Sequence, residues 1–234
     1  MASITFSKIG CVNRQPDGSY HIGPIYGLGG PFDTATEFFK AWAAQSKFEK
    51  IHTQGIITSC GGPGPAADEA LQAMQEFPAQ LAKLLEQGPL NPEFDKGPFP
   101  LRHVDFGHNN IIVDDEWNIL GVIDWEYAIA APWEMVSENM TVRHMSRTIW
   151  PMYYTDTGAP RDDARVNLGH QAYLLACVKK WENELGLTDT LSRVMSSEKM
   201  VDLAYAFKSY EEYRKPGFYL RMLRAHFGDR MEDF

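Results

Sequence analysis

The sequence predicts an α+β fold that is mainly helical, with one β-hairpin at its centre. Two observations predict it. Apolar residues recur at helical spacing over much of the chain before residue 90 and again from residue 131 to the end. Two β-rich runs, 110–113 and 119–123, are joined by the polar turn DDEWN, which is the pattern of a hairpin. With 234 residues, the chain fits one large domain or two small ones.

Composition excludes several classes of protein. The formal net charge of -9 argues against a nucleic-acid partner, because the phosphate backbone attracts the opposite sign. No apolar run approaches the roughly 20 residues that span a bilayer, and the N-terminus lacks the apolar core of a signal peptide. Three separated cysteines, Cys11, Cys60 and Cys177, suggest neither a zinc site nor a disulfide framework. We therefore expect a cytoplasmic protein without a membrane partner.

Extended segments are expected first, over residues 4–23, and helices follow them. Asp33 is a candidate N-cap for a helix that carries Phe38, Phe39 and Trp42. The next helix contains Pro78, which should kink or split it. Further helices are expected at 132–150, 164–185, 198–214 and 218–227. Aromatic residues of the last three are expected to pack in the core: Tyr173, Trp181, Tyr205, Phe207, Tyr210 and Tyr213.

The hairpin offers a reason for placing carboxylates beside apolar strands. If Trp117 lies near its centre of symmetry, Asn110 and Asp124 come out opposite each other at the open end. Asp105 precedes Asn110 by five residues, in the loop that leads into the first strand. We therefore expect two carboxylates and an amide to converge on one spot, anchored by buried apolar strands.

This cluster suits phosphoryl transfer. A carboxylate and an amide oxygen fit Mg²⁺, which prefers oxygen ligands and often binds one or two side chains plus substrate phosphates. A further Asp can accept a proton from an alcohol. Protein kinases use an H-x-D-x-x-x-x-N loop, a hairpin and then a metal-binding Asp. Here His103, Asp105 and Asn110 match the loop, and Asp124 stands at the second metal position.

The stretch HVDFGHNNIIVDDEWNILGVIDWEYA closely resembles the aminoglycoside phosphotransferase and choline kinase family, especially its fungal members. The segments KIGCVNRQPDGSYHIGPI and GPFDTATEFF also resemble the fungal segment between the two lobes of that family. The resemblance implies the C-terminal lobe of a protein-kinase-like fold that uses Mg²⁺ and ATP to phosphorylate the hydroxyl of a small molecule. It implies Asp105 as catalytic base, Asn110 and Asp124 as magnesium ligands, and His103 as a structural residue of the loop.

Two departures from the family pattern affect these expectations. Val104 replaces the usual Gly of HGD, and few residues precede the linker where the nucleotide-binding lobe should be; Lys8 is not in the context of that lobe's lysine. We therefore expect residues 1–32 to be a linker remnant and 33–234 the substrate and metal lobe, with weak or absent activity. The exposed lobe interface favours self-association, and the acidic balance is compatible with a cationic substrate.

Two other functions stay open. The first is a non-catalytic binding module that keeps the lobe but performs no transfer. The second is a metal-dependent hydrolase that uses His103, Asp105, His108 and Asp124 as ligands. Outside these sets, residues 114–116 are interpreted as turn residues. Glu126 and Glu134 are interpreted by default as helix-start charges, with substrate contact as the minor alternative.

Overall fold

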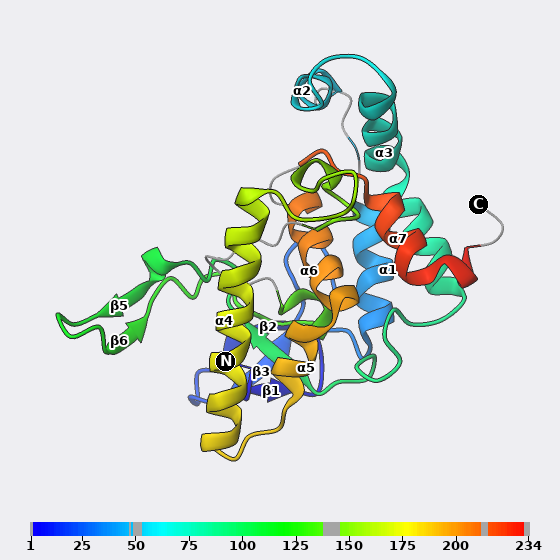
Figure 1. The fold of residues 1–234 in the computed structure, drawn as a ribbon. Coiled ribbons are helices and arrows are strands. Elements are labelled where there is room, and N and C mark those ends of the chain that lie inside the picture. Colours follow the sequence, from blue (N-terminus) through cyan, green and yellow to red (C-terminus); the bar gives the residue numbers. More distant parts are fainter. Residues whose placement is uncertain (1, 47, 49–52, 138–145, 212–214, 232–234) are drawn as a thin grey trace.

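The computed structural model describes residues 2–46, 48, 53–137, 146–211 and 215–231. Helices form most of the regular structure there, and two antiparallel sheets form the rest (Figure 1). The α-helices are α1 (Ala35–Gln45), α2 (Thr53–Ser59), α3 (Pro65–Glu86), α4 (Asp162–Glu184), α5 (Thr190–Ser196), α6 (Glu198–Glu211) and α7 (Tyr219–Phe227). The 3₁₀-helices are η2 (His108–Asn110), η3 (Trp133–Met135), η4 (Pro151–Tyr153) and η5 (Gly228–Arg230). The strands are β1 (Thr5–Phe6), β2 (Gly10–Arg14), β3 (Tyr20–Gly23), β4 (Phe99–Arg102), β5 (Ile111–Val113), β6 (Ile119–Val122) and β7 (Ile129–Ala130). The mainly helical α+β architecture expected from the sequence is thereby confirmed.

The larger sheet joins the N-terminal strands to the middle of the chain. Its order is β1-β4-β7-β2-β3, and neighbouring strands pair antiparallel. Strands β4 and β7 are not among the elements expected from the sequence. They are too short to show a period-two pattern, so pairing rather than sequence defines them. The proposed division of the chain at residue 32 stays a prediction, although residues 5–23 supply three strands of this sheet.

The core lies where α1, α3, α6 and α7 pack together. Phe39 stacks on Phe207 with ring centroids 4.4 Å apart, and Phe77 lies 5.2 Å from the ring of Tyr219. All four side chains are fully buried or nearly so. Each contributes a large apolar area, so this aromatic cluster accounts for much of the burial that holds the helices together.

One local expectation for the helices is wrong, and a second is wrong in part. Helix α1 is capped by Thr34 rather than Asp33: the Thr34 hydroxyl accepts from the Glu37 amide, and Glu37 reaches back to the Thr34 amide, which completes a capping box. Helix α3 continues through Pro78, so the proline does not split it. Of the helix expected at 132–150, residues 133–135 form the 3₁₀ turn η3, and residues 138–145 lie outside the described residues. The next 3₁₀ turn, at 151–153, begins after that range.

The hairpin of β5 and β6 does not lie at the centre of the molecule, as the sequence had suggested. It projects from the side of the helical body (Figure 1). Its apolar side chains are exposed rather than buried: Ile119 is 68% exposed and Trp117 is 82% exposed. A two-stranded ribbon buries little by itself, and no described element covers this one. None of the described helices is both long and apolar enough to cross a membrane.

Candidate active site

The larger sheet holds both ends of the candidate catalytic segment. Arg102, the last residue of β4, pairs with Ile129, the first residue of β7. The 26 residues between them (103–128) therefore leave and re-enter the sheet at adjacent positions. This arrangement brings the loop after β4 and the residues after β6 to the same edge of the sheet, where the predicted site residues lie.

Asp105 and Asn110 are brought together as predicted. The Asn110 Nδ2 donates to the backbone carbonyl of Asp105 at 2.7 Å and to its carboxylate Oδ2 at 3.2 Å. Asn110 is 5% exposed, whereas Asp105 is exposed. The buried amide thus fixes the loop and leaves an open carboxylate beside it.

Neighbouring residues fix the turn between these two side chains. The Gly107 amide donates to the Asp105 carbonyl at 2.9 Å, and the Asn110 amide donates to the Gly107 carbonyl at 3.1 Å. Asn109 donates through Nδ2 to the Asn110 Oδ1 at 3.1 Å. A Cβ on Gly107 would come into close contact with the Asn109 Oδ1, so a larger residue there would have to displace the exposed Asn109 side chain.

His103 connects the loop to the segment that carries Asp124. Its Nε2 lies 2.9 Å from the carbonyl of Ile123, and since a carbonyl only accepts, Nε2 carries the proton. The ring is 5% exposed and contacts Trp125, with centroids 4.9 Å apart, and Phe106 at 5.6 Å. His103 therefore lies below the loop, in a position from which it can support the loop without touching a substrate.

Asp124 is the residue after Ile123, whose carbonyl His103 contacts. The Ile123 amide donates to the Asn110 carbonyl at 3.0 Å, which places Asp124 one residue beyond the position opposite Asn110. Asp124 is exposed, and its φ of 63° lies in the left-handed region, as does that of Tyr127 at 64°. Such backbone strain in non-glycine residues is concentrated at functional sites. No hydrogen bond in the described chain joins Asp124 to Asp105 or Asn110.

The pairing register expected for the hairpin is wrong. Ile111 pairs with Val122 and Val113 with Ile119, with an irregularity between Ile112 and Val113. The cause is the turn, which is centred on residue 116: the Asp114 amide donates to the Asn118 carbonyl, and Trp117 adopts a φ of 67°. A three-residue turn of this kind ends in a left-handed residue and shifts the register by comparison with a turn centred on Trp117.

The turn residues have the structural role expected of them. Asp114 Oδ1 accepts from the amides of Glu116 and Asn118, and its Oδ2 accepts from the Asn118 side chain at 2.9 Å. The hydrogen bond from the Asn118 side chain is the main cause that lowers the pKa of Asp114, followed by that from the Asn118 amide. These bonds close the hairpin at its far end, away from Asp105.

The hydrolase hypothesis is not favoured by this arrangement. It requires His103, Asp105, His108 and Asp124 to face one metal ion. The described residues contain no group of three or more His, Cys, Asp or Glu side chains placed to hold a metal. His103 also directs its protonated Nε2 at a backbone carbonyl instead of a ligand position.

An H-x-D-x-x-x-x-N loop, a hairpin and a following Asp together define the class of phosphoryl-transferring proteins. Comparison with protein-family models agrees: residues 61–134 match the model described as the phosphotransferase enzyme family. Comparison with curated proteins found no match, and comparison with solved structures found none. The family resemblance is thus confirmed over residues 61–134, which include His103, Asp105, Asn110 and Asp124.

Two residues near this loop, Asn109 and Trp125, had no role in the sequence interpretation. A third residue, Glu134 in η3, has an environment that the sequence did not indicate. Asn109 holds the Asn110 amide, and Trp125 packs on His103 while its Nε1 donates to the Val122 carbonyl at 2.8 Å. The Asn-Asn pair and the Trp after Asp124 were visible in the sequence, but nothing there indicated their contacts. Glu134 lies in the first turn of η3, as the default interpretation expected, but it is fully buried, and desolvation raises its pKa to about 7.

Proposed function

We propose that this protein is a phosphotransferase that uses Mg²⁺ and ATP to phosphorylate a hydroxyl of a small molecule. The observation that carries the proposal is the hydrogen-bonded pair of Asp105 and Asn110 inside the segment that matches the phosphotransferase family. Phosphoryl transfer depends mainly on positioning and on charge stabilisation. A fixed loop with an open carboxylate suits both needs.

In this proposal Asp105 accepts the proton of the attacking hydroxyl. Its carboxylate is exposed, so a substrate can approach it, while the bond from Asn110 holds it in one orientation. A carboxylate held within reach of the hydroxyl can take up its proton, as a general base does. His103 acts as a positioning residue, because it ties the loop to the Ile123 carbonyl.

Asn110 and Asp124 are the proposed magnesium ligands. An amide oxygen and a carboxylate are the donors that Mg²⁺ takes from proteins, with phosphate oxygens and water completing the shell. The Asp124 carboxylate has no hydrogen-bond partner among the described residues, and it follows a residue bonded to Asn110. The donor set therefore fits the ion. When bound, the ion would neutralise charge that develops on the transferred phosphoryl group.

The acceptor is proposed to be a small, cationic alcohol. The net charge of -9 favours cations near the surface, and the proposal includes neither nucleic acid nor membrane as a partner. The exposed apolar hairpin is compatible with self-association. We also propose that turnover is weak and that the chain divides into two parts at residue 32.

The decisive experiment compares two isosteric changes in purified protein. With Mg-ATP at millimolar concentration and a panel of amino alcohols, Asp105→Asn should lower turnover by about 10²–10⁴, the usual contribution of a general base. Asp115→Asn is the matched control, since Asp115 is an exposed turn residue and the charge change is the same. Equal turnover of the two variants would refute the proposed base.

The same protein tests the alternative of a non-catalytic binding module. Titration calorimetry with Mg-ATP should show magnesium-dependent binding that is weakened in Asp124→Asn. Binding together with turnover supports the phosphotransferase. Binding without turnover for any acceptor in the panel would favour the module, and stoichiometric zinc in the purified protein would favour the hydrolase.

A further inference from the structure

A cavity lies away from the candidate active site. It measures about 590 Å³, within the range of small-molecule sites. Its wall includes Gly97 and Pro98, which directly precede β4, whereas the catalytic loop follows β4. The four residues of the strand separate the two by roughly 13 Å. The cavity is therefore a different site from the loop of Asp105.

One wall of the cavity is aromatic and fixed. Phe94 and Trp133 are 8% and 4% exposed, and their ring centroids lie 5.7 Å apart. The Trp133 Nε1 donates to the Pro98 carbonyl at 2.8 Å, so the indole is held in place and its polar atom already has a partner. Leu187 and Leu191 line the cavity as well. This wall suits a flat or apolar group.

A buried carboxylate belongs to the same cavity. Glu182, near the end of α4, is only 7% exposed and lines the cavity. Its Oε1 accepts from the Ser192 amide at 3.0 Å, while Oε2 has no partner in the described part of the chain. This oxygen is open to the cavity and can accept a hydrogen bond from a ligand, and the low polarity around Glu182 strengthens such a bond.

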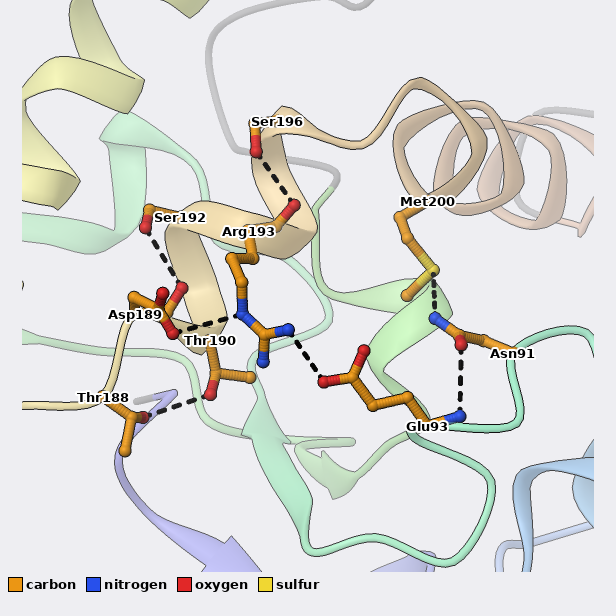
Figure 2. A network of polar contacts seen from close by, with 9 residues as sticks. All are labelled: Asn91, Glu93, Thr188, Asp189, Thr190, Ser192, Arg193, Ser196 and Met200. Carbon is orange, nitrogen blue, oxygen red and sulfur yellow. Dashed lines mark hydrogen bonds and ion pairs between the residues drawn. The ribbon is translucent and has the colours of Figure 1, made fainter.

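The rim of the cavity is also acidic. Arg193 lies between Glu93 and Asp189, at 2.8 Å and 3.1 Å, as Figure 2 shows. Glu93, Glu182 and Arg193 line the cavity, and the Arg193 guanidinium is also paired with Asp189, so its positive charge is offset without Glu182. Because Arg193 is already bonded to two carboxylates, it is poorly placed to receive an anionic ligand.

We propose that this cavity binds a small organic cation, namely a protonated amine carried on an apolar or aromatic body. The ammonium donates to the Glu182 Oε2 in a charge-assisted hydrogen bond. The body of the ligand packs against Trp133 and Phe94, whose ring faces also attract a cation. This inference stands independently of the phosphotransferase proposal, since none of the residues of the catalytic loop takes part.

Calorimetric titration of the full chain with 2-phenylethylammonium and with 2-phenylethanol tests the proposal. The two probes share an aromatic body and differ in charge. The ammonium should bind about tenfold more tightly or better, equivalent to about 1.4 kcal/mol. In Glu182→Gln the affinity for the ammonium should fall to that for the alcohol, because the amide keeps an acceptor for Ser192 but loses the charge.

Two controls separate the site from general effects. Glu184→Gln removes the same charge from an exposed position two residues away, and it should leave both affinities unchanged. Asp105→Asn should also leave them unchanged, which separates this site from the proposed active site. An equal effect of Glu184→Gln, or loss of binding in Asp105→Asn, would overturn the proposal.

A second variant keeps the test decisive if Glu182→Gln does not fold. Leu187→Ala shortens an exposed apolar side chain of the wall and should weaken both probes several-fold. Absence of binding by the ammonium, equal affinity for ammonium and alcohol, or unchanged binding in Leu187→Ala would each show that the cavity is not this site.

Discussion

The two longest helices of the molecule have almost the same length and very different burial. Helix α3 has 22 residues, of which nine are buried; α4 has 23 residues, of which only Ala164 and Glu182 are buried. In Figure 1, α3 packs beside α1 and α7, whereas α4 lies along the outside of the body. Length therefore does not decide which helix supports the core.

The spacing of the apolar residues explains the difference. In α3 the buried positions recur every three or four residues from Ala67 to Leu85, which forms one continuous stripe. In α4 several apolar side chains point to solvent, among them Val166, Tyr173 and Trp181, which are more than half exposed. Helix α3 thus contributes to stability through burial. Helix α4 contributes Glu182, which lines the cavity and accepts a hydrogen bond from the Ser192 amide of α5.

The largest effect expected from this comparison is on stability. Phe77→Ala in α3 should lower the free energy of unfolding by about 3–5 kcal/mol, because the ring is fully buried and its removal leaves a cavity. Tyr173→Ala in α4 should lower it by no more than about 0.5 kcal/mol, because that ring is 75% exposed. Chemical denaturation of the two variants measures both values.

The contrast between the two variants is the informative quantity. Phe77 contacts the rings of Trp42, Tyr210 and Tyr219, with centroids 5.2–6.0 Å away. Tyr173 has no such ring contact among the described residues. If Tyr173→Ala proved as destabilising as Phe77→Ala, α4 would be covered by a partner in solution, and the self-association expected from the sequence would gain support.

A somewhat smaller effect is expected from a buried glutamate in η3, which packs against α6 and β4. Glu182 has a hydrogen-bond partner, but both carboxylate oxygens of Glu134 lack one. Desolvation raises the pKa of Glu134 to about 7 from 4.5. The folded state then holds a proton that the unfolded state has lost, so stability falls as pH rises from about 4.5 to 7, by about 3 kcal/mol in total.

Glu134→Gln should remove this pH dependence. Near pH 4 the variant and the parent should unfold at similar denaturant concentration, and at pH 8 the variant should be more stable by about 3 kcal/mol. Glu116→Gln, at an exposed position of the hairpin turn, is the control and should leave the pH profile as it was. A Glu134→Gln variant that is no more stable than the parent at pH 8 would mean that water or another group pairs with the carboxylate.

The sequence predicted the catalytic loop better than the hairpin behind it. His103, Asp105 and Asn110 have fixed spacing, and the loop closes through short-range bonds, so their proximity could be inferred from chain order. The roles assigned to them stay predictions. The position of Asp124 depends on the register of β5 and β6, which a one-residue change in turn geometry alters.

Burial was harder to predict than helicity. The aromatic residues of the last helices were expected to pack alike, and Phe207 and Tyr210 are indeed buried, but Tyr173 and Trp181 face solvent. The periodicity of one helix cannot say whether another element covers it. The cavity beside Glu182 could not be inferred either, because it is formed by segments about 90 residues apart in the chain.

The smallest effect concerns Pro78 inside α3. A neighbouring side chain replaces the backbone hydrogen bond that this proline cannot make. Pro78 has no N–H, so the carbonyl of Met74, four residues earlier, lacks its helical donor. The Tyr210 hydroxyl donates to that carbonyl at 2.8 Å. Tyr210→Phe should therefore cost about 1–2 kcal/mol of stability, the penalty for an unpaired buried carbonyl. In a Pro78→Ala background the restored amide can take over, so the same change should cost roughly 1 kcal/mol less. An equal cost in both backgrounds would show that α3 continues through Pro78 by packing alone, without this hydrogen bond.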